Sequence, residues 1–67
     1  MNAKKIAKQI KKLREEKGLT MTELSKLTGI TISSLSHYES GYRIPSDENK
    51  VLIARAFSTT IDEIFYS

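Results

Sequence analysis

The chain has 67 residues and a net charge of +3, and it contains one histidine and no cysteine. A chain of this length forms one domain, residues 1–67, and the lack of cysteine excludes disulfides and the usual zinc sites. No apolar run approaches the roughly 18 residues that a membrane span needs, and the lysine-containing N-terminus does not have the pattern of a secretory signal. We therefore expect a cytoplasmic protein with no membrane association, no cofactor and no metal.

The basic side chains are concentrated at the N-terminal end. Residues 1–17 hold seven of the eleven basic side chains and two of the eight acidic ones. Residues 18–67 hold the other four basic and six acidic side chains and are net negative. This asymmetry suits a polyanionic partner at one end, but a solvated, lysine-rich helix face is the more common meaning of such a run.

Turn residues divide the chain into five helical segments. Gly18, Gly29 and Gly41 fall where helices should stop, and Pro45 stands just before a new helical pattern. No strand pattern competes, so the sequence predicts one all-α bundle. The predicted helices cover residues 3–17, 21–28, 32–39, 47–57 and 61–66.

Capping residues and apolar spacing support these helices. The predicted N-caps are Thr20, Thr31, Ser46 and Thr60, of which the first and last form capping boxes with Glu23 and Glu63. The predicted inward positions are Ile6, Ile10 and Leu13 in the first helix and Val51, Ala54 and Phe57 in the fourth.

Residues 21–40 have the pattern of two short helices joined at one glycine. Gly29 can take the left-handed conformation that ends a helix and turns the chain, and the small Ser25 lets the two helices approach closely. The apolar residues expected to face the core are Leu24, Leu27, Ile30, Leu35 and Tyr38. This arrangement is the helix-turn-helix, which presents its second helix to the major groove of DNA.

Four strings, in this order and spacing, carry a family resemblance: IKKLREEKGLT, ELSKLTGIT, LSHYESGYRIPS, and IARAF with TTIDEIF. From Ile6 to Phe65 the chain resembles the lambda-repressor-like DNA-binding domain of the Cro and phage-repressor, or XRE, type. The resemblance implies a five-helix bundle that acts as a transcriptional regulator, with a repressor expected, as a homodimer on a two-fold double-stranded DNA operator. It also implies that Arg14 and Glu39 form a buried ion pair that positions the third helix; the alternative is two unrelated surface charges.

The same resemblance gives the residues expected at DNA. The full set is Met21, Thr31, Ile32, Ser33, Ser34, Ser36, His37, Ser40, Tyr42 and Arg43. Ile32, Ser33 and His37 match the positions nearest the base edges. The outer face of helix 32–39 lacks the Arg, Lys, Asn and Gln side chains that make bidentate base contacts, so we expect DNA shape to supply much of the specificity.

Several of these residues have a second interpretation. Ile32 either meets a thymine methyl group or packs sideways against Leu35. His37 is either a DNA donor or a solvated surface residue. Tyr42 either donates to a phosphate or packs on the fourth helix, and Arg43 is either a DNA contact or a solvated loop charge.

The chain departs from the family pattern at four positions. Met21 stands where the family usually has a glutamine that contacts a phosphate, so only its backbone N–H remains for that role. Ser58 stands where a glycine is usual. Lys50 occupies a commonly apolar position and Leu52 a commonly polar one, which predicts an additional hydrophobic face on the fourth helix.

We expect the C-terminal end to supply the dimer interface. Its candidates are Leu52, Ile61, Ile64, Phe65 and Tyr66. Some of them must fill the core, and Leu52 and Tyr66 are the best candidates for exposed apolar surface.

An enzyme is not expected, because the chain has no glycine-rich phosphate loop, no metal-ligating cluster and a single histidine. The main alternative is a protein-interaction module of the same fold, such as an antitoxin-like or regulator-docking protein. Its support is the low number of base-reading side chains. A separate regulatory protein is a further candidate partner.

Overall fold

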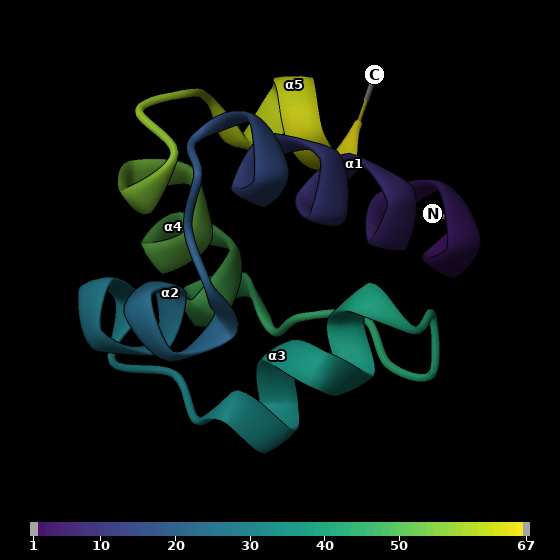
Figure 1. Cartoon of the computed structure of the whole chain (residues 1–67). Coiled ribbons are helices and arrows are strands. Elements are labelled where there is room, and N and C mark those ends of the chain that lie inside the picture. Colours follow the sequence, from purple (N-terminus) through teal and green to yellow (C-terminus); the bar gives the residue numbers. More distant parts are fainter. Residues whose placement is uncertain (1, 67) are drawn as a thin grey trace.

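The computed structural model describes residues 2–66, which form five α-helices joined by short loops (Figure 1). The helices are α1 (Ala3–Glu16), α2 (Met21–Thr28), α3 (Ile32–Glu39), α4 (Asp47–Ala56) and α5 (Ile61–Phe65). The predicted all-α, five-helix fold is confirmed. Helices α2 and α3 have the predicted bounds, and the other three end one residue earlier than predicted. Within the described residues, no helix combines the length and apolarity needed to cross a membrane.

The N-caps lie at the predicted residues, and the predicted capping box at the start of α2 is confirmed. At the start of α2, the Thr20 hydroxyl accepts the Glu23 backbone N–H at 3.1 Å, and the Glu23 carboxylate accepts the Thr20 N–H at 2.9 Å. The backbone N–H of Thr20, by donating to the Glu23 carboxylate, is the main cause that lowers the pKa of Glu23. At α5, Thr60 accepts the Glu63 N–H at 3.1 Å, while the Glu63 carboxylate accepts the Thr59 hydroxyl at 2.7 Å.

The core joins all five helices. Helix α3 packs on α1 and α2, α2 packs on α4, and α5 packs on α1 and α4. The buried apolar side chains are Ile6, Ala7, Ile10, Leu24, Ile30, Leu35, Tyr38, Ile53, Ala54, Phe57, Ile64 and Phe65. Each large side chain among them contributes about 1.5–3 kcal/mol by leaving water, so the orientation of α3 is set by a core to which every helix contributes.

The prediction that Leu27 faces the core is wrong, because its side chain is 61% exposed. The inward face of α2 is formed by Leu24 and Thr28, which are four residues apart and therefore lie above one another. Around the helix axis, Leu27 and Thr28 lie on either side of Leu24, and it is the Thr28 side that faces the core. Similarly, α4 buries Ile53 completely, whereas Val51, which was expected inward, is half-buried.

The turn between α2 and α3 has the predicted geometry. Gly29 has φ of +75°, in the left-handed region that favours glycine. The Ser25 hydroxyl donates to the Ile30 carbonyl, and the Thr28 hydroxyl accepts the Ile30 N–H at 3.1 Å. Ile30 itself is buried in the corner. These contacts fix the direction in which α3 leaves the turn.

Lys50 occupies a position that is commonly apolar in the family. Its aliphatic chain is buried, and its ammonium group has hydrogen-bond partners. It is 6% exposed, and its ammonium donates to the Tyr66 hydroxyl at 3.3 Å and to Asp47 at 3.5 Å. The ammonium also lies 5.7 Å and 5.3 Å from the ring centroids of Phe65 and Tyr66. Burial lowers the pKa of Lys50, but the Tyr66 and Asp47 contacts outweigh it and raise the pKa overall. Lys50 thus ties α4 to the C-terminal end.

Ser58 adopts φ of +54°, and it is the one described residue other than glycine with positive φ. It follows α4 at the position where glycine commonly ends a helix. We expect Ser58→Gly to raise the free energy of unfolding by about 0.5–1 kcal/mol, because glycine removes the left-handed strain. Thermal unfolding followed by circular dichroism measures the change. The control Ser36→Gly, inside α3, should instead lower stability; a lowered stability in Ser58→Gly would contradict the strain argument.

Candidate nucleic-acid interface

An ion pair fixes the position of α3 against α1. Arg14 Nε and Nη2 donate to the two Glu39 carboxylate oxygens at 2.7 Å and 3.1 Å, and Arg14 Nη1 donates to the Leu19 carbonyl at 2.8 Å. The side chains are 16% and 9% exposed, so the predicted pair is present and partly buried. The Glu39 hydrogen bond raises the pKa of Arg14 despite the opposing effect of burial. A bidentate contact of this kind holds both distance and angle between the helices.

A second contact holds α3 from the side of α4. The Asn49 amide donates to the Tyr38 hydroxyl at 2.9 Å, and Tyr38 is otherwise buried in the core. Leu35, one turn earlier, is completely buried. The inner face of α3 is therefore anchored along its length, and its outer face is presented rigidly.

The outer face of α3 is open to solvent and carries no carboxylate. Ser33 and Ser36 are exposed, and Ile32 is 46% exposed. Residues 31–38 contain no aspartate or glutamate, and the Glu39 carboxylate that follows is paired with Arg14. A rigid, carboxylate-free helix face of this kind is compatible with a closely approaching polyanion.

The N-terminus of α3 is capped by Thr31, whose hydroxyl accepts the Ser34 N–H at 3.2 Å and lies 3.1 Å from the Ser34 hydroxyl. Thr31 is exposed and Ser34 is half-buried at the edge of the outer face. Their hydroxyl groups are thus already engaged with one another, although each oxygen retains capacity for a further hydrogen bond.

The C-terminus of α3 organises the loop that follows it. The His37 carbonyl accepts the backbone N–H groups of Tyr42 at 3.0 Å and Arg43 at 3.2 Å, and the Ser40 hydroxyl at 3.1 Å. The His37 and Tyr42 rings lie 5.0 Å apart at 52°. Tyr42 is 75% exposed, and its ring contacts the His37 ring in a tilted arrangement. These hydrogen bonds hold the loop that follows α3 in one conformation. The side chain of Arg43 is exposed on this loop.

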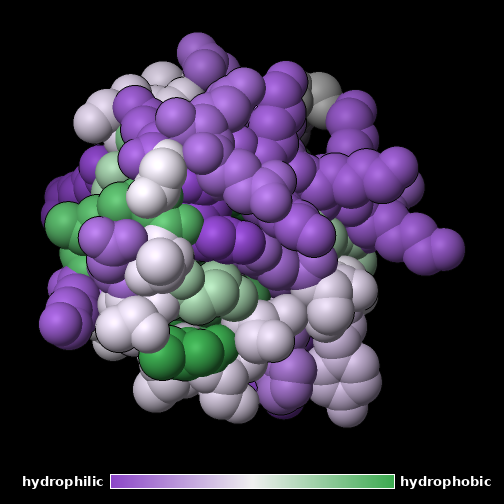
Figure 2. Space-filling view, in the orientation of Figure 1, coloured by the Kyte–Doolittle hydropathy of each residue, from purple (hydrophilic) through white to green (hydrophobic). Residues whose placement is uncertain are grey.

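The structure gathers most of the predicted DNA-contact residues on one side of the molecule, along α3 and its following loop. Met21 is the exception, because its side chain packs against the core and is not directed to this surface. Its remaining predicted role is that of a backbone donor at the N-terminus of α2. Figure 2 shows that the surface over α3 mixes near-neutral residues with a small apolar area, in contrast to the hydrophilic surface over α1.

The five residues predicted at a dimer interface do not share one environment. Ile64 and Phe65 belong to the core, because a helix as short as α5 must bury its apolar side chains to stay docked, and in this conformation they offer no surface to a partner. Leu52 and Ile61 are half-buried against the core. Tyr66 is 59% exposed despite its contact with Lys50.

From the sequence alone, the α1 lysines expected nearest to phosphates are those toward Lys11 or Lys17, and Lys4 is not among them. In the structure Lys4 lies beside Gly41, in the loop that carries Tyr42 and Arg43. The i, i+4, i+7 spacing of Lys4, Lys8 and Lys11 was the available sign that these lysines share one face of α1.

Comparisons with known proteins agree with this architecture. A family model described as Helix-turn-helix matches residues 10–64. The chain is 39% identical over 56 residues to the HTH-type transcriptional regulator AnsR of Bacillus subtilis, an alignment that covers 84% of this chain and 48% of AnsR. It is 35% identical over 60 residues to the cryptic phage CTXphi transcriptional repressor RstR of Vibrio cholerae, with 90% and 54% covered.

The chain thus spans about half the length of these two relatives. No solved structure gives a significant match. The matched residues include all of α2, α3 and α4, and the chain belongs to the helix-turn-helix family, of the lambda-repressor-like, XRE type that its sequence predicts.

Proposed function

We propose that the protein is a sequence-specific, double-stranded DNA-binding transcriptional repressor that inserts α3 into the major groove. The observation that carries this proposal is the outer face of α3, which is exposed, free of carboxylates and held rigidly by the Arg14–Glu39 pair. The names of the two relatives, a transcriptional regulator and a transcriptional repressor, support the same function.

Under this proposal, different residues contact the bases and the DNA backbone. Ile32, Ser33 and His37 face base edges, and the loop residues Tyr42 and Arg43 contact the DNA backbone beside them. Because hydroxyl groups discriminate weakly between bases, sequence-dependent groove shape contributes much of the specificity. Contacts to phosphates then dominate affinity and make it strongly dependent on salt.

We further propose that the protein acts as a homodimer. One helix-turn-helix covers one half-site, and two-fold operators place half-sites about 34 Å apart. The exposed Tyr66, with Leu52 and Ile61 beside the core, supports a partner surface at the C-terminal end of the domain.

Selection from a pool of random duplexes, followed by a gel-shift assay of the recovered sequences, tests this function. We expect enrichment of a sequence with two-fold symmetry and a shift whose affinity falls steeply with salt. Failure to bind any duplex at low salt would instead favour the protein-interaction module of the same fold.

Replacing thymine by uracil in the selected duplex tests the role of Ile32. If Ile32 packs on a thymine C5-methyl group, removing that methyl should weaken binding about fourfold, in line with about 0.8 kcal/mol per buried carbon. The Ile32→Ala variant should no longer distinguish the two duplexes, whereas Leu27→Ala, at an exposed position of α2, should behave as the unaltered protein. Equal binding of both duplexes by the unaltered protein would rule out this contact.

A further inference from the structure

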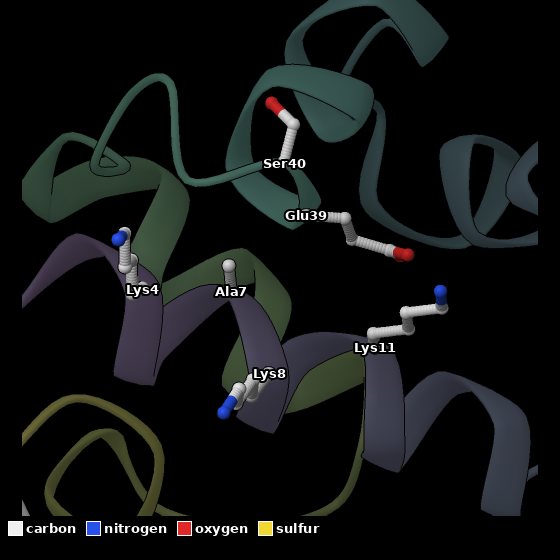
Figure 3. Close-up of a pocket in the computed structure, with 6 residues that line it drawn as sticks. All are labelled: Lys4, Ala7, Lys8, Lys11, Glu39 and Ser40. Carbon is white, nitrogen blue, oxygen red and sulfur yellow. The ribbon is translucent and has the colours of Figure 1, made fainter.

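A basic hollow of about 370 Å³ lies between α1 and the C-terminal end of α3 (Figure 3). Its lining residues are Lys4, Ala7, Lys8, Lys11, Glu39 and Ser40. The three lysines come from successive turns of α1, whereas the last two residues come from the end of α3. Figure 3 shows Lys11 directed toward Glu39, while Lys8 extends away from α3.

The charge of this hollow is positive, because its one carboxylate is already neutralised. Both Glu39 oxygens accept hydrogen bonds from Arg14, at 2.7 Å and 3.1 Å. Within residues 2–66, none of the three lysines forms a salt bridge with a carboxylate. Three unpaired cations on one helix face attract a polyanion more strongly than the net charge of the chain suggests.

The hollow is continuous with the loop that follows α3. Gly41 has φ of +80°, and a side chain added there would bring its Cβ to 3.8 Å from the Cα and Cγ of Lys4. The loop carrying Tyr42 and Arg43 therefore rests directly on the first turn of α1. The loop of the proposed function and Lys4, the first lysine of the hollow, are therefore neighbours on the surface.

The spacing of the lysines matches a nucleic-acid backbone. Lys4 and Lys11 are seven residues apart, which is about 10 Å along a helix axis. One strand of B-DNA carries a phosphate about every 3.4 Å of its axis, so lysines spread over this length can reach more than one phosphate. Lysine ammonium groups on flexible stems suit such a track, since they act as point charges without a fixed geometry.

We propose that Lys4, Lys8 and Lys11 form a second DNA contact, which binds the phosphates flanking the base pairs that face α3. This inference rests on the proposed function and adds to it. The contact lengthens the site beyond the recognition helix, and it binds the flanks without regard to their sequence, because phosphates carry no base information. An acidic protein segment is the competing occupant of the same face.

A matched pair of double variants tests this contact. Lys4→Gln with Lys11→Gln removes two cations from the hollow, and Lys5→Gln with Lys12→Gln removes two from the neighbouring face of the same helix at the same spacing. Each full-length variant is titrated from about 50 to 200 mM potassium chloride with the selected duplex, bearing either flanks of about one helical turn or no flanks. Urea denaturation verifies that both variants are folded.

On the flanked duplex, we expect the unaltered protein and the Lys5/Lys12 variant to lose about tenfold more affinity over this salt range than the Lys4/Lys11 variant, which has two fewer phosphate contacts. On the unflanked duplex all three should have the same salt dependence. Equal salt dependence of the two variants on the flanked duplex would overturn the contact. Failure of the unaltered protein to bind any duplex would overturn the proposed function as well.

Discussion

Arg14→Met is expected to lower the free energy of unfolding by about 3 kcal/mol. The substitution removes both hydrogen bonds to Glu39 and the one to the Leu19 carbonyl, and it leaves the Glu39 carboxylate 9% exposed without its partner. A domain of this size has a total stability near the lower end of the usual range, about 5 kcal/mol. The variant should therefore be substantially unfolded at moderate urea concentrations, as circular dichroism would measure.

Two further variants separate the ion pair from a general effect of losing a cation. Lys12→Met, at an exposed position of the same helix, should change stability by less than about 0.5 kcal/mol. The double variant Arg14→Met with Glu39→Met should lose less stability than the two single variants added together, because no buried charge is left unpaired. An Arg14→Met protein as stable as the unaltered chain would show that the pair does not support α3.

Ser33→Glu is expected to weaken binding to the selected duplex about 100-fold. Ser33 is exposed on the outer face of α3, so a glutamate there would place a negative charge beside the phosphates of the groove. Like charges brought together at an interface cost several kcal/mol, and about 3 kcal/mol corresponds to this loss of affinity. Fluorescence anisotropy with labelled duplex measures it directly.

The matched control is Gln9→Glu, which makes the same change of charge at a position of α1 that does not line the lysine-lined hollow. It should weaken binding by no more than a few-fold, through the long-range field alone. Equal losses in the two variants would mean that net charge, and not the position of α3, governs binding.

The sequence predicted the helices well because its local signals agree with one another. Thr20 and Glu23 form the expected capping box, and Gly29 takes the expected left-handed conformation. What it could not predict was which of two neighbouring positions faces inward. Leu27 is apolar yet exposed, since the inward face of a two-turn helix is set by how α2 crosses α4, and not by hydrophobicity alone.

In the candidate site, too, some contacts could be predicted from the sequence and others could not. The Arg14–Glu39 pair followed from the family resemblance and is present. The contact between the Tyr42 and His37 rings depends on the path of a loop, and the burial of Lys50 depends on the Tyr66 hydroxyl 16 residues away. Both contacts depend on where the backbone places the two side chains, which residue types and spacing alone do not determine.

Amide chemical shifts of the labelled protein, titrated with the selected duplex, test most directly whether the outer face of α3 meets DNA. We predict the largest changes at Ile32, Ser33 and Ser36 and in the loop at Tyr42 and Arg43, with small changes in α5. Shifts concentrated in α4 and α5, with residues 31–37 unchanged, would contradict the account.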